Sequence, residues 1–138
     1  MESSQLQPIC RLTGRIVHGQ GRGHKVGMPT ANLLPAGDPA LPAPGVYATM
    51  AEVAGRRYPG VTNIGTRPTV DSESRVTIET LLIGAEGDLY GQEMALTVYR
   101  FLRPISKMAS LEAVKEQVMR DKEQVLALFG GGAQGFRP

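Results

Sequence analysis

One short stretch of the chain concentrates residues that could do chemistry, GRGHKVGMPTANL, from Gly21 to Leu33. It contains three glycines, one proline and four side chains that carry N–H hydrogen-bond donors: Arg22, His24, Lys25 and Asn32. Glycines let a backbone approach a ligand closely, and backbone amides beside basic groups attract anions, phosphate above all. No Asp or Glu occurs from Arg11 to Lys25. The stretch therefore favours an anion-binding loop, and a solvated basic loop is the simpler alternative.

The end of this stretch, Met28 to Asn32, has the chemistry of a cation site. Pro29 fixes its own φ and disfavours helical geometry at Met28, so the segment should be extended. In an extended chain Thr30 and Asn32 point to the same side. A hydroxyl oxygen beside a carboxamide oxygen suits Mg²⁺ that also holds phosphate oxygens and waters. We therefore predict a phosphate-and-magnesium cradle here, against the alternative that Thr30 or Asn32 only organises a turn.

Glu79 is a second candidate, on a predicted strand from Arg75 to Leu82. The strand alternates, with one face made by Val76, Ile78, Thr80 and Leu82, and a more polar face made by Arg75, Thr77, Glu79 and Leu81. A carboxylate beside a cleft can accept a proton from a hydroxyl that attacks phosphorus. The commoner fate of such a residue is a solvated glutamate paired with a base such as Arg75.

Short strands and turns must position these residues. Strands are predicted at Arg11–Val17, Val46–Val53 and Met94–Leu102, besides the one that carries Glu79. Gly55 marks a hairpin turn into Arg57 and Tyr58, and the sequence EGDLYG, 86–91, is a further turn. Surface loops are predicted at 35–44 and 67–71. Short strands with glycine- and proline-rich connections indicate a small antiparallel barrel or sandwich.

The C-terminal part has the period of a helix. Ser110 can cap it, and its apolar stripe consists of Leu111, Val114, Val118, Val125 and Leu128. Gly130 to Gly132 should end the helix, which we expect to pack its stripe across the barrel. We expect three regions: an N-terminal extension at 1–10, one domain at 11–129 and a glycine-rich flexible tail at 130–138.

Composition narrows the class of protein. The 138 residues include 41% apolar and 20% charged residues, which fits one soluble globular domain with no membrane association. The N-terminus MESSQLQPIC lacks the features of a signal peptide, and Cys10 is the single cysteine, so a cytoplasmic protein is expected. The Rossmann, P-loop, zinc and nucleophile-elbow motifs are all missing. Aromatic residues make up 5% and the net charge is +2, which argues against binding of nucleic acid.

Five segments in this order resemble the riboflavin kinase (flavokinase) family, above all the kinase domain of bacterial bifunctional riboflavin kinase/FMN adenylyltransferases. They are GRIVHGQGRGHKVGMPTANL, PAPGVYAT, YPGVTNIGTRPTV, IETLL followed by GDLYG, and FLRPISKMASLEAVKEQV. Together they cover roughly residues 11 to 128. The resemblance implies a closed antiparallel β-barrel of about six strands with Greek-key connections and a C-terminal helix. It also implies transfer of the γ-phosphate of ATP to the ribityl 5′-hydroxyl of riboflavin, which gives FMN and ADP.

The resemblance assigns roles to residues. The family's metal-binding Thr and Asn fall on Thr30 and Asn32, and its catalytic base falls on Glu79. The predicted ATP and phosphate contacts are Gly21, Arg22, Gly23, His24, Lys25, Gly27, Pro29, Thr30 and Asn32. Tyr90 and Arg103 are predicted flavin contacts. The cofactor is expected to be Mg²⁺, with Zn²⁺ and Mn²⁺ left open, and the chain is expected to be a monomer.

The chain also departs from the family pattern. After Glu79 and Thr80 the family usually has a histidine, whereas this chain has Leu81, and the next turn is Ile83 to Glu86. Only 13 residues precede Gly14, so we expect the adenylyltransferase half, and FAD synthesis with it, to be missing from this chain. Whether it is a natural single-function kinase or an excised domain stays open. A regulatory module that senses flavin or nucleotide without catalysis is the alternative function.

Overall fold

The computed structural model describes residues 6–17, 30–68 and 74–130 and shows six strands and one helix in this part of the chain. The strands are β1 (Cys10–Val17), β2 (Thr30–Pro35), β3 (Gly45–Val53), β4 (Arg56–Pro68), β5 (Ser74–Leu82) and β6 (Glu93–Arg103). The helix is α2 (Leu111–Leu128). Every strand and the helix that the sequence analysis predicts is present, with bounds that differ by one residue at most.

The six strands close into one antiparallel barrel in the order β1-β2-β5-β4-β3-β6, and β6 returns to pair with β1. Strands β3, β4 and β5 follow one another as hairpins. Strand β2 lies beside β5, and β6 lies beside β3. Each of these two strands therefore completes a Greek key with the three hairpin strands. The closed barrel with a C-terminal helix confirms the predicted fold.

The interior of the barrel is filled by alternate residues of all six strands. Three buried threonines cross it as a chain: the Oγ1 atoms of Thr49 and Thr62 lie 2.9 Å apart, and those of Thr62 and Thr80 lie 2.8 Å apart. Gly60 leaves room for this chain, because a Cβ there would lie 2.6 Å from Thr49 Oγ1. The hydroxyl groups thus satisfy each other inside an apolar core.

The turn between β3 and β4 is the hairpin that Gly55 predicts. Ala54 and Gly55 have φ angles of 53° and 79°. Positive φ at both central residues is the geometry of the two-residue turn that matches the twist of paired strands. It sets a register in which Val53 lies opposite Arg56 and Gly45 opposite Ile64.

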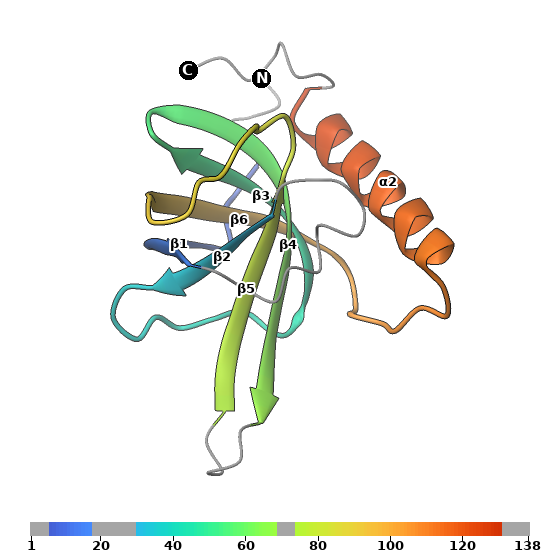
Figure 1. Ribbon diagram of the computed structural model, residues 1–138, viewed down its shortest axis with the longest axis horizontal. Helices are drawn as coiled ribbons and strands as arrows, with labels where there is room; N and C mark the ends of the chain where they lie inside the picture. The colour runs from blue at the N-terminus through green and yellow to red at the C-terminus, as the bar shows by residue number, and fades with distance from the viewer. Residues whose placement is uncertain (1–5, 18–29, 69–73, 131–138) are drawn as a thin grey trace.

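Helix α2 lies on the outside of the barrel, along β3 and β4 (Figure 1). Its first turn is capped by Ser110, whose Oγ accepts a hydrogen bond from the Ala113 amide at 3.1 Å. Val125 is fully buried in an outer apolar cluster with Val46, Ala48, Val61, Leu81 and Ile83. The stripe packs across the barrel as predicted, except that Leu111 stays 45% exposed at the start of the helix.

Two predictions about the strands need correction. Strand β4 continues to Pro68, so the loop predicted at 67–71 begins too early. Val76, predicted on the buried face of β5, is 42% exposed. Both differences have one cause: β4 and β5 remain paired beyond the other strands, to Pro68 and Ser74, so this end of the hairpin has no core to cover (Figure 1).

Candidate active site

Thr30 and Asn32 lie on β2 with their side chains on the outer face of the barrel. The residues between and after them, Ala31 and Leu33, are buried in the interior at 1% and 4% exposure. Because side chains alternate along a strand, Thr30 and Asn32 share the opposite face, where both are partly exposed. The extended conformation after Pro29 and the common side are thus as predicted.

Asn32 lies directly opposite Glu79 across the pairing of β2 with β5. On the other side of Glu79, Asn63 of β4 lies directly opposite it as well. Side chains at opposite positions of an antiparallel pair have Cβ atoms about 4.5–5.5 Å apart. Two carboxamides therefore flank one carboxylate in a row that crosses three strands, Asn32, Glu79 and Asn63, which we call the outer polar row.

The carboxylate of Glu79 makes no polar side-chain contact with the described residues. Glu79 is partly exposed, and within the described residues it takes part in no ion pair and no side-chain hydrogen bond. The next outward residue, Leu81, is only 8% exposed because it packs in the apolar cluster under α2. The face of β5 predicted to be polar is thus apolar and covered at one end, and Glu79 sits at the border of the covered part.

The donor set at Thr30 and Asn32 fits Mg²⁺. Their Cα atoms are two residues apart on one strand, about 6.7 Å by strand geometry, so a hydroxyl and a carboxamide oxygen can lean toward one ion. Neutral oxygen ligands that leave positions for waters and phosphate oxygens are typical of Mg²⁺ bound together with a nucleotide. The carboxylate of Glu79, opposite Asn32, adds negative charge that favours a cation nearby.

The remaining predicted phosphate contacts, Gly21, Arg22, Gly23, His24, Lys25, Gly27 and Pro29, lie outside the described residues. They precede Thr30 directly in the chain. Their assignment stays a prediction.

Tyr90 and Arg103 lie on opposite sides of the outer polar row. The loop that carries Tyr90 is fastened to β1, because the Gly91 amide donates to the Ile16 carbonyl at 2.8 Å. Arg103 ends β6 and pairs in register with Val46 of β3. Tyr90 precedes the first residue of β6 and Arg103 is the last, so the length of this 11-residue strand separates them and the structure does not bring the two residues together. Their roles in flavin binding stay predictions.

Two residues at the site escaped the sequence analysis. Asn63 lies within the segment YPGVTNIGTRPTV, but its position beside Glu79 depends on the order of the strands, which one sequence does not give. Asp121 is 1% exposed and binds Arg103. A signal for Asp121 did exist, because an aspartate there interrupts the apolar stripe of the helix between Val118 and Val125.

A hollow of about 630 Å³ occurs on another part of the barrel, lined by Thr13, Glu52, Ala54, Gly55, Arg57, Glu93, Met94 and Ala95. None of these residues belongs to β2 or β5. Its carboxylates face arginines, with Glu52 3.9 Å from Arg11 and 3.8 Å from Arg57. We place the candidate active site at the outer polar row, because Glu79, which has no ion pair among the described residues, lies there directly opposite Asn32.

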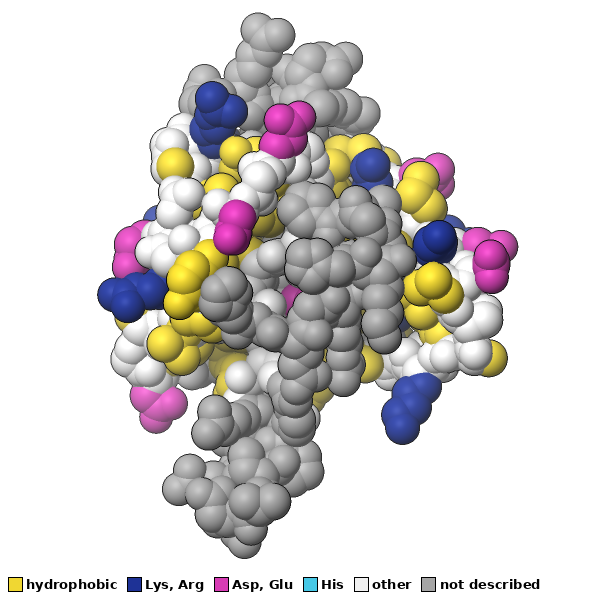
Figure 2. Space-filling view, in the orientation of Figure 1, with side chains coloured by type: hydrophobic (Ala, Val, Ile, Leu, Met, Phe, Trp, Pro, Cys, Tyr) yellow, Lys and Arg dark blue, Asp and Glu magenta, His cyan; other side chains and the backbone are white. Residues whose placement is uncertain are grey.

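Charged side chains of both signs are interspersed over the described surface in the view of Figure 2, with no large patch of one sign. No helix among the described residues is long and apolar enough to cross a membrane.

The fold and site define a closed six-stranded β-barrel with a docked C-terminal helix and a carboxylate between two carboxamides on its outer face. The family model for riboflavin kinase, Flavokinase, matches residues 6–129, and the chain belongs to this family.

Curated relatives support this assignment. The chain is 36% identical over 123 residues to the bifunctional riboflavin kinase/FMN adenylyltransferase of Pseudomonas fluorescens, which covers 89% of this chain and 39% of the relative. It is 38% identical over 120 residues to the protein of that name from Escherichia coli K12, covering 86% of this chain and 38% of the relative. The chain thus spans less than two fifths of the length of these relatives.

Solved structures have the same fold. A protein from Streptococcus pneumoniae, titled a macrolide-efflux protein, superimposes with a TM-score of 0.79 at 28% identity, covering 86% of this chain and 38% of that one. Riboflavin kinase from Trypanosoma brucei superimposes with a TM-score of 0.61 at 20% identity, covering 86% of this chain and 76% of that one. The second likeness shows the barrel fold alone.

Proposed function

We propose that this chain transfers the γ-phosphate of ATP to the 5′-hydroxyl of riboflavin and gives FMN and ADP. The observation that carries the proposal is the direct opposition of Asn32 and Glu79 across β2 and β5. It sets a carboxylate that has no ion pair among the described residues beside oxygen donors that suit a nucleotide-bound cation. Family membership over residues 6–129 supports the choice of substrates.

Glu79 is the proposed general base. As the 5′-oxygen of riboflavin forms its bond to the γ-phosphorus, the bond from that phosphorus to the β–γ bridging oxygen breaks and ADP leaves. The proton of the hydroxyl passes to the Glu79 carboxylate, which then releases it to solvent. Because Glu79 has no cation partner among the described residues, its oxygens are free to accept the hydroxyl proton.

The two sides of Glu79 suit the two substrates. On the β2 side lie Thr30 and Asn32, which directly follow the glycine-rich stretch, so the phosphates of ATP belong there. On the β4 side lie Asn63 and, beyond it, the part of the barrel covered by α2, so riboflavin belongs there. A hydroxyl that approaches from the β4 side meets the γ-phosphate in front of Glu79, which is the positioning that phosphoryl transfer needs.

When bound, Mg²⁺ would neutralise charge on the phosphates that is otherwise unfavourable for attack. Thr30 and Asn32 are the residues proposed to hold it. The preference for Mg²⁺ over Zn²⁺ or Mn²⁺, a cytoplasmic location and a monomeric state stay predictions.

Chromatographic detection of FMN tests this proposal. Purified protein is mixed with riboflavin, ATP and Mg²⁺, beside a sample with excess chelator and a sample without ATP. We expect FMN in the complete mixture alone. Tight binding of riboflavin without any FMN would contradict the kinase reaction and would favour the regulatory module, with the altered turn from Ile83 to Glu86 as the first place to examine.

A further inference from the structure

Arg103 and Asp121 form the best-defined ion pair among the described residues. Arg103 Nε donates to Asp121 Oδ1 at 3.0 Å, and Arg103 Nη2 donates to Oδ2 at 2.8 Å. Gln117 Nε2 also donates to Oδ1, at 3.0 Å. The side chain of Asp121 is 2% exposed and that of Arg103 is 23% exposed. Two parallel charge-assisted hydrogen bonds with little solvent fix both distance and orientation.

The pair fastens α2 to the end of β6. Arg103 is the last residue of β6, and Asp121 lies in the middle of α2, between Val118 and Val125, which pack in or against the outer apolar cluster. Apolar contacts alone hold a helix on a surface without fixing how far it slides or turns. A bidentate pair removes that freedom, and it thereby also fixes both ends of the connecting segment, residues 104–110.

This segment and α2 border the outer polar row on two sides. In the register of the sheet, Arg103 lies opposite Val46, Val46 opposite Asn63, and Asn63 opposite Glu79. Ile105 reaches back over β4, because a Cβ at Gly65 would lie 3.5 Å from Ile105 Cδ1. Gly65 follows Asn63 on the outer face, so the row lies between Ile105 on one side and the cluster under α2 on the other.

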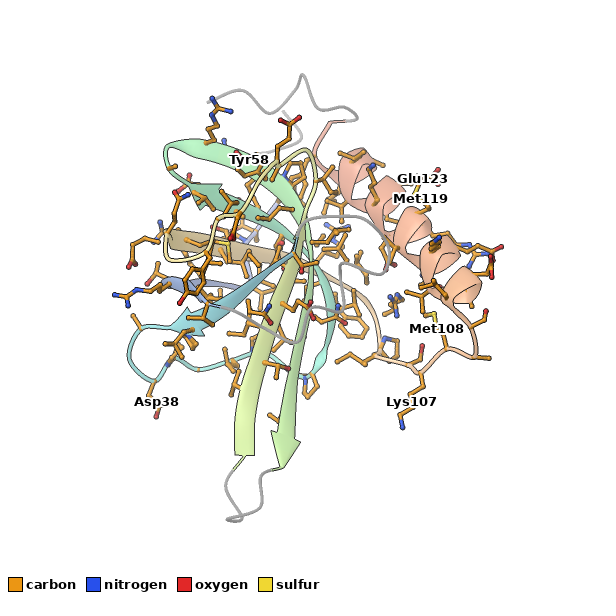
Figure 3. The ribbon with its side chains drawn as sticks, viewed as in Figure 1. Asp38, Tyr58, Lys107, Met108, Met119 and Glu123 are labelled. Carbon is orange, nitrogen blue, oxygen red and sulfur yellow. The ribbon has the colours of Figure 1, made fainter. Side chains whose placement is uncertain are left out.

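The guanidinium group of Arg103 is engaged within the protein. Besides the two nitrogens that bind Asp121, Nη1 donates to the Pro104 carbonyl at 3.4 Å. Three strand spacings separate Arg103 from Glu79, about 14 Å at 4.8 Å a strand. Lys107, the cation within the segment, extends away from the barrel and offers Asp121 no substitute (Figure 3).

We propose that Arg103 and Asp121 are positioning residues, which hold segment 104–110 and α2 as the wall of the riboflavin side of the site. The inference rests on the proposed kinase function and differs from the prediction that Arg103 touches the flavin. In this arrangement Arg103 affects riboflavin binding by holding segment 104–110 and α2 in place, without touching the flavin itself. Loss of either partner should therefore weaken riboflavin binding equally and leave the ATP side, on β2, unaffected.

The test compares Asp121→Asn and Arg103→Lys with Glu116→Gln. Glu116 lies on the same helix in an exposed pair with Arg120 at 3.9 Å, so its replacement is the matched control. The readouts are the riboflavin Kd from flavin fluorescence quenching, the KM values of both substrates, and kcat. We expect riboflavin Kd and KM to rise about tenfold in both pair variants, with ATP KM and kcat within about threefold of wild type. The double variant should be no worse than either single one, because both remove the same interaction.

Loss of riboflavin affinity in Arg103→Lys with normal affinity in Asp121→Asn would overturn the inference in favour of a direct flavin contact. Normal affinity in both would show that the pair only stabilises the fold. Should Asp121→Asn not fold, Gln117→Met removes one donor to the same carboxylate, and it should raise the riboflavin Kd in the same direction.

Hydrogen exchange separates failure of the inference from failure of the kinase function. Amides of 104–110 and of α2 should exchange faster in Asp121→Asn than in wild type and Glu116→Gln, without riboflavin present. If wild-type protein neither binds riboflavin nor forms FMN, the proposed function fails and the riboflavin role of the pair falls with it. Unchanged exchange in the variant would instead show that the pair does not hold segment 104–110 and α2 on the barrel.

Discussion

Asn32 on β2 and Glu79 on β5 lie directly opposite each other, although 46 residues separate them in the chain. The pairing is possible because β3 and β4 are placed on the far side of β5, so that β2 can close onto it. Asn32, a proposed cation ligand, and Glu79, the proposed base, are thereby set at the distance of one cross-strand pair.

Thr30→Ala and Asn32→Ala are each expected to weaken the binding of Mg-ATP and to leave riboflavin binding unchanged. Loss of one oxygen donor to a charged ligand costs about 1.5–3 kcal/mol, or roughly 10- to 100-fold in affinity. Titration of activity with Mg²⁺ and ATP measures the effect, with Thr97→Ala on β6 as the control. Wild-type Mg²⁺ dependence in both variants would refute the assignment of the metal site.

Gly60→Ala should destabilise the barrel. The added Cβ would lie 2.6 Å from Thr49 Oγ1 and 2.7 Å from Thr80 Cγ2, inside the buried threonine chain. Such overpacking costs about 1–3 kcal/mol of unfolding free energy. Gly65→Ala on the same strand is the control, since its Cβ would meet no atom closer than 3.5 Å. Urea unfolding should show a lower midpoint for Gly60→Ala alone, and equal midpoints would mean that the interior is less tightly packed than described.

The free energy of unfolding should fall at alkaline pH because of two groups, the Cys10 thiol on β1 and the Tyr47 hydroxyl on β3. Burial raises the pKa of the Cys10 thiol above 9.0, and burial, with a smaller contribution from Cys10, raises the pKa of Tyr47 above 10.0. The unfolded chain therefore loses these protons at lower pH than the folded protein does. By linkage, the contribution of these two protonated side chains to the free energy of unfolding is complete below pH 9.0. It is lost as the pH rises through the two raised pKa values.

Cys10→Ala and Tyr47→Phe test this assignment through unfolding midpoints from pH 7 to about 11, a range that spans both ordinary pKa values. Each variant should lose less stability over the alkaline part of the range than wild type does. Tyr47→Phe also loses the hydrogen bond from Tyr47 Oη to the Ala43 carbonyl, so it should start from a lower stability at pH 7. Identical slopes in all three proteins would show that other groups cause the alkaline loss.

Local patterns in the sequence account for much of the structure. Alternation predicted the strand that carries Glu79, proline geometry predicted the extended segment at Thr30 and Asn32, and Ser110 marked the start of α2. These features depend on neighbours within a few residues, so a single sequence carries them. The burial of Val76 was predicted wrongly, because its exposure depends on where the other strands end and not on its neighbours in the sequence.

The arrangement of the site lay beyond those patterns. The positions of Asn63 beside Glu79 and of Asp121 beside Arg103 follow from pairings between distant segments. Periodicity fixes which face a residue occupies and leaves open which strand lies next to it. The chemistry of the residues and the resemblance to the family predicted roles for Thr30, Asn32 and Glu79, and the order of the strands places Asn32 directly opposite Glu79.

The most direct test of the central claim is the comparison of Glu79→Gln with wild type in two measurements, single-turnover formation of FMN and the riboflavin Kd. The amide keeps the size of the side chain and cannot accept the hydroxyl proton. We predict that FMN formation slows about 10²- to 10⁴-fold, the usual contribution of a general base, while the riboflavin Kd stays within about twofold. Unchanged turnover, or a loss of affinity as large as the loss of rate, would contradict the role of Glu79 as the base.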